Sequence, residues 1–296
     1  KTTQMPKFIL PALLLLLLPF MGISQAASNL YIIDMERGNA DFFQFRNPQL
    51  LTFDNGQFYN NQPFLMDSLL FYTASVDTTQ TDLYLLDLEA KTRYRMTNSP
   101  ESEYSPIVMP NGNYLSMVRV SADGNNSQQL WKMPLDLSGG PTVVMDRVKG
   151  VGCHEWLSDS LVAIFIVGNP HQLKLFDVYT QRFELIKSNV GRCLHHQDNG
   201  DFFYVDKSLE GAWFIKSVNF DQRRPTLTVV QTLKDVEDFA VTNDGLFLMG
   251  KGSKLYKFNA AIDDSWIEIA DFTNWGIRNI TRIDVETDKI VVVSNP

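Results

Sequence analysis

The sequence lacks the short motifs that usually identify an enzyme. It has no Gly-x-Ser-x-Gly elbow, no Cys-x-x-Cys pair and no Gly-rich loop of the kind that cradles phosphate. His154-Glu155 is not followed by a second His at the spacing of a zinc-protease helix. These absences favour a role other than catalysis and leave enzymatic activity undecided.

Basic residues and helical patterns are also scarce. The chain has 26 Lys and Arg against 34 Asp and Glu, a formal net charge of −8, and no basic run is longer than Arg223-Arg224. Nucleic acid is not an expected partner, because phosphate binding requires a basic surface. Helical periodicity of useful length is absent beyond residue 26, so strands are expected instead.

The longest apolar segment lies at the N-terminus. Lys1 and Lys7 precede the apolar residues Phe8 to Met21, and Ser24-Gln25-Ala26 places small residues where signal peptidase reads them. This segment of fourteen residues, two of them prolines, is too short to cross a bilayer core of about 30 Å. Residues 1–26 are therefore predicted to be a signal peptide rather than a transmembrane segment. Export to the periplasm or the cell exterior would follow.

One strand pattern returns six times along the rest of the chain. The copies follow one another at intervals of about 40 to 53 residues, which is the length of one four-stranded propeller blade. Polar pairs such as Asn111-Gly112, Asn199-Gly200 and Asp244-Gly245 suit tight hairpins between strands. The sequence therefore predicts an all-β, six-bladed β-propeller over residues 27–296. The six copies begin at Leu30, Leu83, Leu130, Leu173, Trp213 and Leu255.

The first and last segments of this region each supply half of a blade. Residues 29–50 contain only the repeated strand and the strand that follows it, whereas residues 277–296 contain Ile280 to Val285 and Lys289 to Val293. Together they predict a last blade closed by two N-terminal and two C-terminal strands. Such closure hides sheet edges whose unpaired backbone groups would otherwise invite aggregation.

Several segments resemble the repeats of TolB-like propellers, whose units combine a Ser-Pro, a Pro-Asp-Gly turn and a strand that ends before Gly-Gly. The resemblance is clearest in Ser105-Pro106, Pro110-Asn111-Gly112 and Leu130 to Gly140, and it extends over nearly all of residues 27–296. Val151 to His154 and Gly191 to His195 are similar to stretches in exported propellers of Bacteroidetes-type bacteria. The resemblance implies a six-bladed scaffold, usually with a binding role, and no particular reaction.

Polar residues gather at the predicted mouth of the channel. The first strand of each blade lines the centre of a propeller, so residues at the start of these strands converge. His154 and His195, with a carboxylate, could bind Zn²⁺ or another divalent ion; alternatively, the mouth is polar because water fills it. No cofactor is predicted, and a divalent metal stays open. The candidate ligand-binding residues are Asn61, Glu103, Tyr104, His154, Glu155, Arg192, His195, Asp238 and Arg278.

The chain contains two cysteines, Cys153 and Cys193, near the first strands of consecutive repeats. An oxidising compartment would permit a disulfide between them. Their positions differ by two to three residues in the repeat alignment, which argues for a separation beyond the roughly 7 Å that a disulfide tolerates. We expect two buried free thiols.

Three functions fit these observations. The preferred hypothesis is an exported, non-catalytic interaction module that holds a protein or peptide partner of the cell envelope at the pore mouth. A propeller that binds a small molecule or a glycan is the second. The third is a metal-dependent hydrolase or lyase of propeller type.

Overall fold

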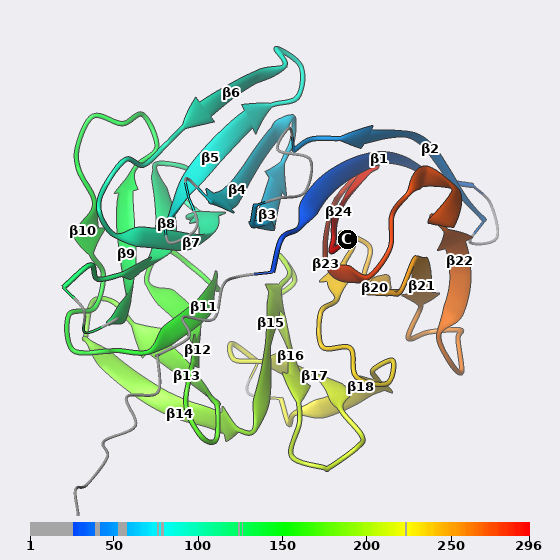
Figure 1. The fold of residues 1–296 in the computed structure, drawn as a ribbon. Coiled ribbons are helices and arrows are strands. Elements are labelled where there is room, and N and C mark those ends of the chain that lie inside the picture. Colours follow the sequence, from blue (N-terminus) through cyan, green and yellow to red (C-terminus); the bar gives the residue numbers. More distant parts are fainter. Residues whose placement is uncertain are drawn as a thin grey trace, which may run out of the picture.

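The computed structural model describes residues 26–38, 42–52, 58–75, 77, 80–123, 125, 127–222 and 224–296. Over these residues the strands form six four-stranded antiparallel sheets arranged as a ring (Figure 1). The prediction of an all-β, six-bladed β-propeller is confirmed. The apolar segment of the predicted signal peptide lies outside the described residues. In the described part, no helix is long and apolar enough to span a membrane.

Blades 1 to 5 follow one another along the chain, and the strands of each sheet are ordered as in the sequence. Blade 1 consists of β3 (Asn60–Met66), β4 (Leu69–Ser75), β5 (Thr81–Asp87) and β6 (Thr92–Arg95). Blade 2 consists of β7 (Ser102–Val108), β8 (Tyr114–Val120), β9 (Gln128–Pro134) and β10 (Thr142–Val143). Blade 3 consists of β11 (Val151–Trp156), β12 (Leu161–Ile166), β13 (Gln172–Asp177) and β14 (Arg182–Ser188).

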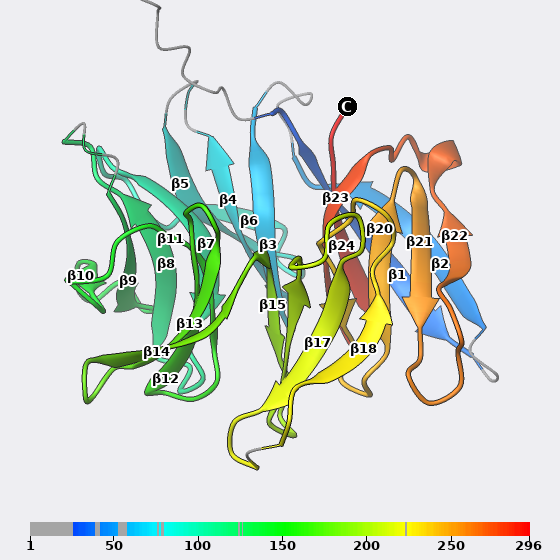
Figure 2. The same ribbon diagram turned by 90° about the horizontal axis from the view of Figure 1, so that it is seen from below.

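The remaining blades complete the ring. Blade 4 consists of β15 (Val190–His196), β16 (Asp201–Asp206), β17 (Phe214–Asn219) and β18 (Leu227–Gln231). Blade 5 consists of β19 (Ala240–Val241), β20 (Phe247–Lys251), β21 (Lys254–Phe258) and β22 (Ile267–Asp271), followed by the 3₁₀ helix η2 (Thr273–Trp275). Figure 2, turned by 90°, shows the strands running from one face of the ring towards the other.

Blade 6 joins the two ends of the described chain. It consists of β23 (Ile280–Glu286), β24 (Lys289–Ser294), β1 (Asn29–Arg37) and β2 (Phe43–Leu50), in the order β2-β1-β24-β23 across the sheet. β1 pairs with β24 in antiparallel register, with Ile33 opposite Ile290 and Leu30 opposite Val293. The predicted closure by two N-terminal and two C-terminal strands is confirmed.

The hydrophobic core lies between adjacent blades rather than at the centre of the ring. One cluster joins Val118 and Leu130 of blade 2 to Trp156, Val162 and Phe176 of blade 3. Strand β12 has four consecutive buried residues, because it packs against a neighbouring blade on each face. Its burial on both faces explains why the run from Leu161 to Ile166 shows no polar alternation.

The innermost strands carry β-bulges that interrupt their pairing with the second strand of the blade. Register shifts occur between Asn61 and Phe64 in β3 and between Tyr104 and Ile107 in β7. Gln62 and Ser105, inside these two bulges, have φ values of 55° and 52°. A bulge bends the strand and changes the direction of its side chains. The bulges therefore decide which residues reach the centre of the ring.

Candidate functional site

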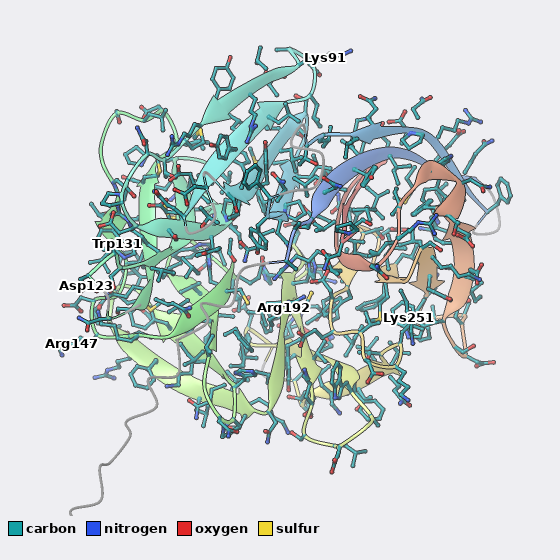
Figure 3. The ribbon with its side chains drawn as sticks, in the orientation of Figure 1. Lys91, Asp123, Trp131, Arg147, Arg192 and Lys251 are labelled. Carbon is teal, nitrogen blue, oxygen red and sulfur yellow. The ribbon has the colours of Figure 1, made fainter. Side chains whose placement is uncertain are left out.

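A small polar cavity lies at the centre of the ring and is lined by residues from all six blades. Its volume is about 110 Å³. Figure 3 places Arg192 of β15 close to the middle of the ring. The polar and sulfur-containing lining residues are Gln62, Ser105, Cys153, His154, Glu155, Arg192, Cys193, His195, Asp238, Arg282 and Asp284.

Five of the nine residues predicted at the pore mouth line this cavity, namely His154, Glu155, Arg192, His195 and Asp238. They come from three consecutive blades. In this part of the chain, from β11 to β19, the sequence repeats align well, so their positions could be predicted. The structure thus brings most of the predicted polar residues together, including both histidines.

The other four predicted residues are not among those that line the cavity. Glu103 is fully buried between blades 1 and 2, where its Oε1 accepts a hydrogen bond from Ser99 Oγ at 2.6 Å. The ring of Tyr104 packs edge-on against Tyr59. Arg278 is exposed, and its backbone N–H donates to Ser294 Oγ. The Oδ1 atom of Asn61 accepts from the backbone N–H of Gln62, and these two residues begin the bulge of β3.

The two histidines form hydrogen bonds in opposite directions around the ring. His154 Nε2 lies 2.7 Å from Ser116 Oγ of blade 2, and Ser116 uses its hydroxyl proton to donate to the Ile107 carbonyl. Nε2 of His154 therefore carries the ring hydrogen. His195 Nε2 donates to the Phe239 carbonyl of the loop before β19 at 2.7 Å. Burial lowers the pKa of His154 to about 3 and that of His195 to about 4, so both are neutral near pH 7.

This arrangement does not favour a metal ion shared by the two imidazoles. Both Nε2 atoms donate hydrogen bonds to other blades, so either imidazole could bind a metal ion only through its Nδ1 atom. Among the described residues, no three His, Cys, Asp or Glu side chains are grouped to hold a metal ion. The described residues therefore do not supply the three protein ligands of a typical zinc site.

Two carboxyl groups face the cavity from opposite sides of the ring. Glu155 belongs to blade 3 and Asp284 to blade 6, three blades away in either direction. Burial raises the pKa of Asp284 to about 7, although its carboxylate accepts hydrogen bonds from the backbone N–H groups of Leu65 and Val285. Burial, and then the nearby charge of Asp284, raises the pKa of Glu155 well above its usual range. Both carboxyl groups therefore hold a proton more readily than an exposed carboxyl does.

Two arginines of the cavity already have acidic partners. Arg192 Nη1 lies 3.6 Å from Glu237 Oε1, and Arg282 Nη1 lies 3.8 Å from Asp238 Oδ2. Asp238 also accepts a hydrogen bond from the backbone N–H of Ile283, so it links blade 5 to blade 6. Glu237 also accepts a hydrogen bond from Lys207 Nζ at 3.1 Å, so Arg192 shares its acidic partner.

Three buried polar atoms of the cavity-lining residues have no hydrogen-bond partner. They are Ser105 Oγ, His154 Nδ1 and Arg192 Nε, and they make up half of the six such atoms found in the described part of the chain. Buried polar groups in proteins almost always have partners, including water or a bound group. Their concentration at one cavity marks it as the candidate site.

The two cysteines are free and buried, as predicted. Cys153 Sγ donates to the Arg192 carbonyl at 2.7 Å, and Cys193 Sγ donates to the Phe239 carbonyl at 3.1 Å. Each thiol thereby links its blade to the next one. Burial raises the pKa of Cys153 to about 12, which keeps it as an unreactive thiol.

The proteins found to be similar to this chain are solved structures. No protein-family model matches the sequence, and neither does any curated protein. The chain is similar to a putative TolB from Agrobacterium tumefaciens, with 10% identity and a TM-score of 0.61, over 92% of this chain and 99% of that one. It is also similar to TolB from Acinetobacter baumannii, with 12% identity and a TM-score of 0.59 over 90% of this chain. The chain spans 64% of the length of that A. baumannii protein.

The fold is that of a TolB-like six-bladed β-propeller. The chain is also similar to a protein of unknown function from Bacteroides thetaiotaomicron, with 12% identity and a TM-score of 0.54 over 91% of this chain and 77% of that one. At these identities the likeness shows the fold alone. The site of this TolB-like chain must therefore be argued from its own residues.

Sequence reasoning missed four polar residues of the central cavity. Gln62 and Ser105 each follow a predicted residue by one position, and Arg282 and Asp284 lie a few residues beyond the predicted Arg278. A one-residue shift on a strand moves a side chain to the other face. The prolines that follow Gln62 and Ser105 were a usable signal, because proline interrupts strand pairing and is tolerated at bulges.

Proposed function

We propose that this protein is an exported, non-catalytic binding module that engages a protein or peptide partner of the cell envelope at its central cavity. The observation that carries the proposal is the set of three unpartnered buried polar atoms around one cavity. A bound group that completes their hydrogen bonds would gain binding free energy, because each unsatisfied buried group costs about 1 to 3 kcal/mol.

The size of the cavity supports a partner's side chain rather than a whole small ligand. Sites for small molecules usually measure about 300 to 1,000 Å³, whereas this cavity measures about 110 Å³. A glycan or a lyase substrate would require the inner strands to move apart. The cavity suits one side chain or a few water molecules, so the interaction module is better supported than the alternatives.

Export remains part of the proposal on the basis of residues 1–26. Two buried free thiols are compatible with an oxidising compartment, because the hydrogen bonds of Cys153 and Cys193 go to backbone carbonyls of different blades. Fusion of residues 1–40 to a reporter that is active only after export tests this part directly. Cytosolic retention of the fusion would contradict it.

Capture of partners from a cell-envelope extract tests the role of the cavity. Arg192→Ala removes a cavity side chain, and Arg182→Ala on the exposed outer strand β14 is the matched control. We expect partners retained by the original protein and by Arg182→Ala to fall at least tenfold with Arg192→Ala. Photocrosslinks from these partners should map to the inner strands. Unchanged capture by a correctly folded Arg192→Ala protein would overturn the proposal.

A further inference from the structure

The carboxyl groups of Glu155 and Asp284 line the cavity without a basic partner in the described part of the chain. In the described part of the chain, the Glu155 carboxyl has neither a hydrogen bond nor an ion pair, although it lines a polar cavity. Asp284 is bonded to two backbone N–H groups and has no basic partner there. Two carboxyl groups that face one cavity repel each other when both are ionised, and a cation between them would remove that repulsion.

The other charged groups around the cavity do not supply this cation. Arg192 and Lys207 share Glu237 of the neighbouring blade, and Arg282 pairs with Asp238. The two imidazoles are neutral near pH 7, and burial keeps the thiols and the Tyr59 hydroxyl protonated. An anion would meet two carboxyl groups and arginines that are already paired. The cavity is therefore complementary to a positive group.

We propose that the cavity is a receptor for one organic cation, the ammonium or guanidinium group at the end of a partner's basic side chain, held between Glu155 and Asp284. The inference rests on the proposed function and adds the chemical class of the group that enters. An organic cation is favoured over a metal ion because three metal ligands are not grouped among the described residues. An ammonium group needs only oxygen acceptors, which two carboxyl groups provide.

Binding of the cation is linked to the release of a proton. Burial raises the pKa of Glu155 above its usual range and that of Asp284 to about 7, and each carboxyl group must be ionised to pair with a cation. While one proton is released for each cation bound, the binding constant rises about tenfold for each unit of pH. The affinity for the cation therefore increases from pH 5 towards pH 8 and is lowest in acid.

Titration calorimetry with small probes tests the inference. The probes are n-butylammonium and n-butylguanidinium, with n-butanol as the neutral control and butyrate as the anionic control. We expect both cations to bind at least tenfold more tightly than n-butanol. Their binding enthalpy should change with the ionisation enthalpy of the buffer, since protons are released. Tighter binding of butyrate, or of Mn²⁺ or Ca²⁺, would overturn the assignment to an organic cation.

The variant Glu155→Gln makes the test specific. It leaves the fold's hydrogen bonds intact, because the Glu155 carboxyl makes none among the described residues, whereas Asp284 holds two backbone groups. The matched control is Glu184→Gln on the exposed face of β14 in the same blade. We expect Glu155→Gln to weaken cation binding at least tenfold and to flatten its pH dependence, with no change for Glu184→Gln. Equal affinities and pH profiles would refute the inference.

The proposed partner function and the proposed cation site can be refuted independently of each other. If Arg192→Ala abolishes partner capture but butylammonium does not bind, the module stands and the cationic assignment is wrong. If butylammonium binds with proton release but Arg192→Ala leaves partner capture unchanged, the cation site stands and the proposed partner function is wrong.

Discussion

Closure of the ring by blade 6 can be measured with one pair of isoleucines. Ile33 of β1 and Ile290 of β24 lie opposite each other, and both are completely buried in one cluster. Truncation of a buried isoleucine to alanine costs about 2 to 5 kcal/mol, because the lost contacts leave a cavity. At about 2 to 4 °C per kcal/mol for a chain of this size, Ile33→Ala should lower Tm by roughly 4 to 20 °C.

The assay is urea denaturation of single and double variants. We expect the change in the free energy of unfolding of the double variant to differ by about 0.5 to 3 kcal/mol from the sum of the changes for Ile33→Ala and Ile290→Ala, since the two side chains share a contact. Ile267→Ala on the outer strand β22, where 43% of the side chain is exposed, is the control and should change stability by less than about 0.5 kcal/mol. An Ile33→Ala protein as stable as the control would refute the closure of the ring through these strands.

Three further predictions concern other parts of the ring. Cys153 and Cys193 should react with a thiol reagent only after denaturation, as mass spectrometry can show, and a linked peptide from the unreduced protein would contradict this. Gly250→Ala should destabilise the protein by about 1 to 3 kcal/mol in thermal unfolding, because a Cβ there would collide with Ile280. Gly140→Ala is the control and should not destabilise the protein, because a Cβ at Gly140 would meet open space. Burial raises the pKa of Glu103 from its ordinary 4.5 to about 7, so the folded state binds more protons than the unfolded state in this range. The free energy of unfolding should therefore fall as the pH rises from about 4.5 to about 7, less steeply in Glu103→Gln, and equal slopes would contradict it.

The architecture could be predicted because it depends on local and repeated patterns. Asn111-Gly112 and Asn199-Gly200 form hairpin turns in which the glycines have φ values of 70° and 84°, as their residue types require. The half-blades at the two ends complement each other in strand number, so the closure of blade 6 followed from the order of the strands alone.

The candidate site could be predicted only in part. His154, Arg192 and Asp238 were found because their repeats align with the inner strands. Gln62, Arg282 and Asp284 were not, because bulges shift the register by a residue that spacing does not reveal. Glu103 shows the opposite error, since its position in the repeat resembles that of a channel residue while its side chain is buried between two blades.

The sequence by itself determined the number of blades, the composite last blade and the state of the two cysteines. These properties follow from periodicity, strand order and spacing, which are features of the linear sequence. Only the tertiary structure decided that His154 and His195 bond to different blades and that Glu155 faces Asp284. Contacts across the ring join residues from blades far apart in sequence, and their protonation depends on burial that the whole ring creates.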